Sequence, residues 1–168
     1  REQHGREYKR HLPENLRWIE KASQRGLRLK PWFVSPAQVV GIGEQRFRIE
    51  LATDLTPIFL MGSYFNTCLS LGGCNQLSVL ANAYDANKQV VFMYARNRQG
   101  ERTVVARKLI AISRKYKLLG YCCYIASHIS DKEHRGEITL AMARYCAVLA
   151  AKCGLELSDE DTPQSIGS

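Results

Sequence analysis

Residues 88–125 of this 168-residue chain read KQVVFMYARNRQGERTVVARKLIAISRKYKLLGYCCYI, and this stretch decides the fold. It contains three runs of β-branched, aromatic and other apolar residues, over 88–95, 102–112 and 117–125. The first run is apolar almost throughout, which is typical of a central strand covered on both faces. Between the first two runs, Asn97-Arg98-Gln99-Gly100 predicts a hairpin loop in which the glycine adopts a positive φ. We therefore predict a three-stranded antiparallel meander.

A long helix is predicted directly after this meander, over about 131–153. Ser130 and Glu133 match a capping box at its start, and Gly154 ends it. Its apolar residues form a stripe wide enough to cover a sheet: Ile138, Met142, Tyr145, Cys146, Leu149 and Cys153. The sequence therefore predicts an α+β fold, in which a mostly antiparallel sheet is packed by this helix.

Shorter elements are predicted before residue 88. They are a helix from Pro13 to Gly26, an extended crossing between Pro31 and Pro36, strands over 47–51 and 58–61, and a helix over 75–84. The length of the chain and its 45% hydrophobic content suit one globular domain. We predict that this domain covers 1–157, with a loosely attached N-terminal arm (1–11) and an acidic disordered tail (158–168).

The basic residues are concentrated in the meander. The chain has 24 Lys and Arg against 16 Asp and Glu, which gives a net charge of +8. Residues 88–117 hold nine of the cations and a single acid, Glu101, so this segment carries the whole net charge. A local basic field of this kind attracts a phosphate-bearing partner.

Arginines cluster around the predicted hairpin loop. Arg96, Arg98 and Arg102 flank its tip, where they are expected to converge on phosphate groups. A guanidinium group suits this role because it binds two phosphate oxygens at once. We therefore predict a non-enzymatic binding module, without a cofactor, that docks RNA, DNA or another polyphosphate on the basic hairpin.

Four more residues of the meander are candidates for the same interface: Tyr94, Arg107, Lys108 and Tyr116. Arg107 and Lys108 are adjacent on a strand and so point to opposite faces, which takes one of them away from the core. The two tyrosines offer rings on which unpaired bases stack. The same charges also suit another protein as partner, or the acidic residues 159–161 of the chain itself.

A cysteine-dependent enzyme is an alternative function. The segment from Tyr64 to Asn75 contains a Gly-Gly pair and leads into a predicted helix, whose start favours a thiolate. Cys68 or Cys74 would then be the nucleophile, with His128 or His134 as base. The spacing of these cysteines is longer than that of a zinc knuckle, so we predict no metal site.

The order of the elements suggests a second enzymatic alternative. A short helix, three strands, and then His134-Arg135-Gly136 opening an Ala-rich helix resemble the central part of the GNAT acyltransferases, over about residues 75–157. The resemblance implies an acyl-CoA-dependent acyltransferase whose helix start holds the pyrophosphate of the cofactor. Of the phosphate-binding loop of that family, this chain keeps only the pair Arg135-Gly136, and Glu137 adds a negative charge beside it.

Six cysteines bear on the compartment of the protein. Cys122 and Cys123 are adjacent, and Cys146 and Cys153 are two helical turns apart. We therefore expect no disulfide between the two members of either pair. This pattern predicts reduced thiols and a cytoplasmic protein. The longest apolar runs are too short to span a membrane, so no membrane partner is predicted. The chain begins at Arg1, which suggests a domain excised from a longer protein.

Overall fold

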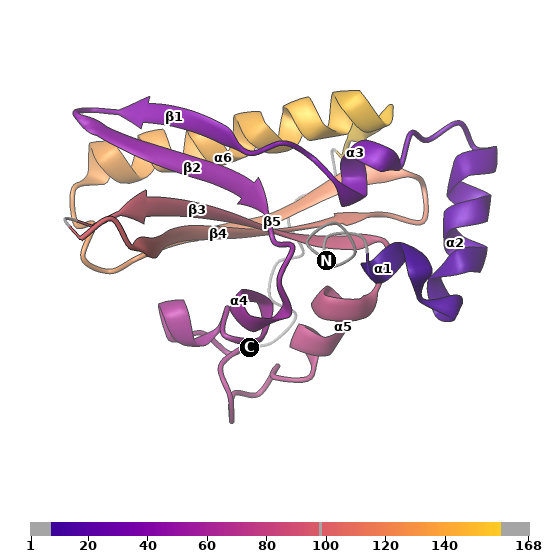
Figure 1. Cartoon of the computed structure of the whole chain (residues 1–168), viewed down its shortest axis with the longest axis horizontal. Helices are drawn as coiled ribbons and strands as arrows, with labels where there is room; N and C mark the ends of the chain where they lie inside the picture. Colours follow the sequence, from indigo (N-terminus) through magenta and orange to yellow (C-terminus); the bar gives the residue numbers. More distant parts are fainter. Residues whose placement is uncertain (1–7, 98, 159–168) are drawn as a thin grey trace.

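The computed structural model describes residues 8–97 and 99–158 and contains one six-stranded sheet (Figure 1). The elements are α1 (Tyr8–His11), α2 (Pro13–Gln24), α3 (Lys30–Phe33), β1 (Gln38–Ile42), β2 (Gln45–Leu51), α4 (Leu55–Phe59), η2 (Ser63–Phe65), α5 (Ser78–Tyr84), β3 (Lys88–Arg96), β4 (Arg102–Ile112), β5 (Lys117–Ile125), α6 (Lys132–Cys153) and β6 (Glu156–Leu157). The strands follow one another in chain order across the sheet, and all neighbours are antiparallel except β5 and β6. The predicted α+β fold, with its meander and long C-terminal helix, is confirmed.

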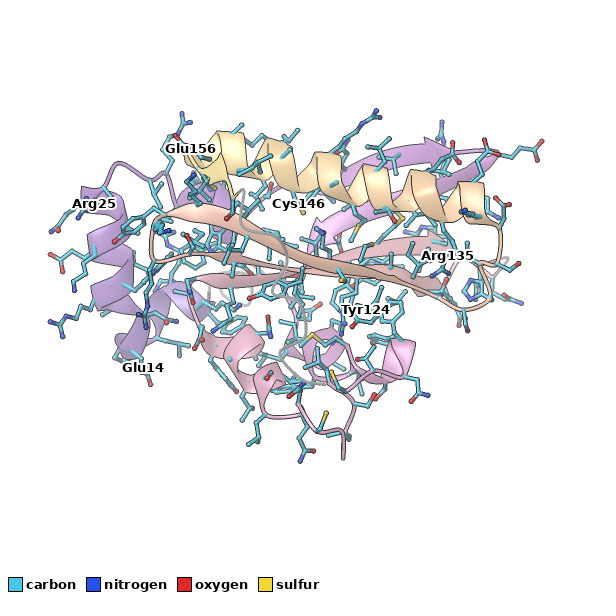
Figure 2. The ribbon with its side chains drawn as sticks, turned by 180° about the vertical axis from the view of Figure 1, so that it is seen from behind. Glu14, Arg25, Tyr124, Arg135, Cys146 and Glu156 are labelled. Atoms are coloured by element: carbon cyan, nitrogen blue, oxygen red, sulfur yellow. The ribbon has the colours of Figure 1, made fainter. Side chains whose placement is uncertain are left out.

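The first strand of the meander, β3, is buried on both faces because the sheet lies between two layers of helices (Figure 1). On β3, Val91 and Met93 belong to the core beneath α6, whereas Val90 and Phe92 belong to the core beneath α4 and α5. Alternation of side chains along a strand places these two sets on opposite faces. In Figure 2, Cys146 lies on the side of α6 that faces the sheet.

The second apolar layer corrects one predicted strand. Residues 58–61 are not a strand, because Leu55–Phe59 forms α4 and the backbone N–H of Leu60 donates back to the carbonyl of Thr56 at 3.0 Å. Pro57 lies in the first turn of this helix, where its missing N–H leaves no bond unmade. The short apolar run therefore folds as a helix, with Ile58 buried against the sheet.

Two other local predictions were wrong in detail. The segment between Pro31 and Pro36 contains a helix, α3, with Pro31 near its start and both Trp32 and Phe33 buried. The cap of α6 is Asp131 rather than Ser130, and its carboxylate accepts a hydrogen bond from the His134 backbone N–H at 2.7 Å. A carboxylate at this position also interacts favourably with the helix dipole.

The predicted N-terminal arm is described from Tyr8 onward, and this part is firmly attached. Lys9 on α1 is buried, and its ammonium group donates to the carbonyls of Asn82 and Lys88, both at 2.7 Å. Burial lowers the pKa of Lys9 from 10.5 to about 7; Lys88 adds to this effect and Asp85 opposes it. The predicted tail lies outside the described residues from 159 onward.

The lowered pKa of Lys9 predicts a pH dependence of stability. Between about pH 7 and 10.5 the unfolded chain holds a proton on Lys9 that the folded chain has released, so stability increases with pH. We expect the free energy of unfolding to rise by up to about 1.4 kcal/mol per pH unit from pH 7 to 8.5. Urea titrations of the wild type and of Lys9→Met measure this slope. A wild-type slope no steeper than that of Lys9→Met would contradict the expectation.

Candidate phosphate-binding cleft

The two hairpins of the sheet separate at one end. Pairing between β2 and β3 stops at Arg48 and Tyr94, although β2 continues to Gln45 and β3 to Arg96. A cleft of about 640 Å³ lies at this end, lined by Val39, Gln45, Arg46, Phe47, Arg48, Tyr94, Ala95, Arg96, Arg102 and His128. Figure 1 shows the β1–β2 and β3–β4 hairpins diverging here. The cleft is thus formed where the sheet is no longer continuous.

Four arginines from three strands meet in this cleft. Arg48 on β2 is directly opposite Tyr94 on β3, and Arg96 on β3 is directly opposite Arg102 on β4. Arg46 is two residues from Arg48, so its side chain leaves the same face. Like charges in directly opposed positions destabilise a sheet, so the pairing of Arg96 with Arg102 is unfavourable for the fold itself.

Part of this repulsion is relieved by one carboxylate. Glu50 accepts from the Nε of Arg48 at 2.6 Å and also forms an ion pair with Arg102. Arg96 donates to the carbonyl of Gly100 at 2.7 Å. Within the described parts of the chain, neither Arg46 nor Arg96 forms an ion pair with a carboxylate. The four arginines carry four positive charges, and the one carboxylate that pairs with them in the described residues, Glu50, carries one negative charge.

An aromatic ring stands beside these charges. The guanidinium carbon of Arg102 lies 4.0 Å from the centre of the Tyr94 ring, which is a cation–π contact. Burial raises the pKa of Tyr94 to about 12, so the phenol is neutral at physiological pH. Arg102 and Tyr94 both line the cleft and together form a partly exposed part of its wall.

Three of the residues predicted from the sequence meet here: Tyr94, Arg96 and Arg102. Arg98, also predicted for this interface, lies outside the described residues. The sequence did not indicate Arg46 and Arg48, because their place beside Tyr94 depends on the pairing of β2 with β3. Their alternation around Phe47 indicated only the exposed half of a strand.

Arg107 and Lys108 do not belong to the cleft. They lie on opposite faces of β4 as predicted, but neither reaches open solvent at the hairpin tip. Arg107 is buried beneath the segment from Met61 to Phe65, where its Nη1 donates to the carbonyl of Met61 at 2.9 Å. Lys108 is half-buried and donates to the carbonyl of Tyr121. Residues 55–84 form the layer on this face of β4, and the sequence did not predict that they would cover Arg107.

Tyr116 is also distant from the cleft. It lies in the β4–β5 turn, at the end of β4 opposite to the loop that precedes Arg102. There the guanidinium carbon of Arg25 lies 5.8 Å from the centre of its ring. An 11-residue strand separates this turn from the basic tip, so Tyr116 cannot stack a base held in the cleft.

Cys68 and Cys74, the candidate nucleophiles of the enzymatic alternative, both lie in the described part of the chain. Cys68 and Cys74 are exposed, and the Sγ of Cys68 accepts from the side-chain amide of Asn75 at 3.4 Å. No hydrogen bond joins either thiol to His128 or His134 in the described part of the chain. The described residues also contain no group of three or more His, Cys, Asp or Glu side chains placed to hold a metal ion. All six cysteines are free thiols.

The acyltransferase resemblance implies an anion site at the start of α6, and the protein's own Asp131 side chain lies at that position. The Asp131 carboxylate caps the first turn of α6. Arg135 turns back to donate to the carbonyl of Ile129 at 2.9 Å (Figure 2). An anion at this position would have to displace Asp131 and would meet Glu137 nearby.

Comparison with known proteins identifies no relative: no family model, no curated protein and no solved structure matches this chain. No helix in the described residues is long and apolar enough to cross a membrane.

Proposed function

We propose that the chain is a binding module that holds the phosphate backbone of a nucleic acid, or of another polyphosphate, in the cleft between the two hairpins. The observation that carries this proposal is the convergence of Arg46, Arg48, Arg96 and Arg102 on one cleft, while in the described residues only Glu50 forms ion pairs with any of them. Guanidinium groups on three strands match phosphate groups spaced along a polymer.

Two features favour an unpaired nucleic acid as the ligand. The cleft has a volume of about 640 Å³, which suits a few nucleotides of a single strand rather than a double helix. Tyr94 and Arg102 line the cleft in contact with each other, and bases of single strands stack on both guanidinium planes and aromatic rings. Recognition of this kind depends little on sequence, because phosphate contacts do not distinguish bases.

Loss of three arginines is expected to abolish most of the binding. We expect the wild type to bind a fluorescent single-stranded oligonucleotide at micromolar affinity at low salt, with steep weakening as salt increases. The variant Arg46→Gln/Arg96→Gln/Arg102→Gln should bind about 100-fold more weakly and show a shallower salt dependence. Fluorescence anisotropy across a salt series measures both quantities.

A matched variant separates the cleft from general charge. Arg17→Gln/Lys21→Gln/Arg144→Gln removes the same charge from the exposed surfaces of α2 and α6. It should bind within about threefold of the wild type, because these residues lie outside the cleft. Absence of binding to single strands, duplex and inorganic polyphosphate at low salt would refute the proposed function. Equal weakening by both triple variants would refute the cleft as its site.

A further inference from the structure

A positive charge is buried on the face of β4 that is turned away from α6. Arg107 is 1% exposed, and the centres of the Tyr124 and Phe65 rings lie 4.5 and 5.6 Å from its guanidinium carbon. Its Nη1 donates to the carbonyl of Met61, but its Nε is buried without a hydrogen-bond partner. No carboxylate in the described residues forms an ion pair with it. Buried charges in proteins are usually paired, so a buried guanidinium with an unpartnered Nε is unusual.

Two hydroxyl groups of the segment that covers Arg107 also lack hydrogen-bond partners. Thr67 Oγ1 and Ser70 Oγ are buried without hydrogen-bond partners. Both belong to the tight segment that begins at Met61, in which the Thr67 N–H donates to the Gly62 carbonyl at 3.1 Å and the Ser70 N–H donates to the Thr67 carbonyl at 2.9 Å. Three of the four buried unpartnered side-chain atoms found in the described residues therefore belong to Arg107 and to the segment that covers it.

This region has access to solvent. Cys68, between Thr67 and Leu69, is exposed, and it interacts electrostatically with Arg107. Tyr124, whose ring lies against the guanidinium, is 40% exposed on the side of the sheet that faces α4 (Figure 2). Exposed surface therefore lies beside the buried charge, at Cys68 and Tyr124.

We propose that Arg107, Thr67 and Ser70 form a second anion-binding site, distinct from the cleft, that takes a small oxyanion such as a phosphate or carboxylate group. The guanidinium would donate from its unpartnered Nε, and each hydroxyl would donate one hydrogen bond. The negative charge would neutralise Arg107, whose pKa burial lowers in the free protein. The site is independent of the proposed nucleic-acid binding, since none of its residues lines the cleft.

Alkylation of the neighbouring thiol tests this site. Iodoacetate carries a carboxylate and iodoacetamide does not, so the ratio of their rates reports an attraction for oxyanions. At Cys68 this ratio is expected to exceed that at Cys74, an exposed thiol of the same segment, by about tenfold. Inorganic phosphate or acetate should lower the ratio at Cys68 more than chloride does at equal ionic strength. Peptide mass spectrometry resolves the two cysteines, and the phosphate and acetate arms show which oxyanion is preferred.

Hydroxyl variants distinguish a ligand site from an unsatisfied patch of the core. Thr67→Val and Ser70→Ala keep the shape of the segment and remove one donor each. If the hydroxyls bind the oxyanion, each variant requires several-fold more phosphate or acetate for the same protection of Cys68, while the cleft variant Arg46→Gln/Arg96→Gln/Arg102→Gln keeps wild-type protection. The proposal is overturned if neither oxyanion protects Cys68 beyond chloride, or if both hydroxyl variants are protected like the wild type.

Discussion

Replacing Gly62 with alanine is expected to disrupt the segment between α4 and α5 and to lower the free energy of unfolding by about 3 kcal/mol. A Cβ atom at this position would lie 2.1 Å from both the carbonyl carbon of Leu69 and the backbone nitrogen of Ser70. These are backbone atoms, so no side chain can rotate away to make room. Urea denaturation followed by circular dichroism measures the loss.

The chain offers a control glycine for this experiment. Gly136 lies in α6, and a Cβ atom there would meet nothing within 4 Å. Gly136→Ala should therefore stabilise the protein by about 0.5–1 kcal/mol, because alanine loses less backbone entropy in a helix. If Gly62→Ala were as stable as the wild type, the close approach of residue 62 to residues 69–70 would be contradicted. The proposed oxyanion site depends on the same segment, so this result would weaken it as well.

Replacing Trp32 with alanine is expected to cost about 3–5 kcal/mol of stability. Trp32 is fully buried, and its indole N–H donates to the carbonyl of Ala86 at 2.7 Å. The side-chain amide of Gln89 in turn donates to the carbonyl of Trp32 at 2.9 Å, which ties α3 to the start of β3. Alanine would leave a large cavity at this junction and an acceptor without its donor.

Two further variants divide this cost into its parts. Trp32→Phe keeps most of the buried volume and removes the hydrogen bond to Ala86, so it should cost about 1–3 kcal/mol. Trp18→Ala removes the other tryptophan of the chain, which is only half-buried, and should cost less than Trp32→Ala. Thermal and urea unfolding of the three variants gives the order. A cost for Trp32→Ala no greater than for Trp18→Ala would contradict the placement of α3 in the core.

The predictions from sequence succeeded where the signal was local. The hairpin at Asn97–Gly100 needs a glycine with positive φ, and Gly100 has a φ of 81°. The helix after Pro13 and the helix that ends at Gly154 were also found, because proline and glycine mark helix ends through their own backbone preferences. Short apolar runs were ambiguous: residues 58–61 suit either a strand or a helix, and packing against the sheet selected the helix.

The site was predicted only in part, since charge density does not say which way a side chain points. Arg107 belongs to the basic segment by sequence, yet the segment from Met61 to Phe65 covers it. Two irregularities of strand register, near Tyr94 and Lys108, change the alternation along β4 and β5. A bulge of this kind has no reliable mark in the sequence, and it moves every following side chain to the other face.

The meander, the long helix and the concentration of positive charge could be predicted, because they depend on residues that are neighbours along the chain. The folded chain alone shows that Arg46 and Arg48 join Arg96 and Arg102 in one cleft, and that Arg107 is enclosed with an unpartnered Nε. Both outcomes depend on contacts between distant segments: β2 against β3, and the loop at Met61 against β4. Such contacts form because they bury apolar surface, and the positions of the charged groups follow from that burial.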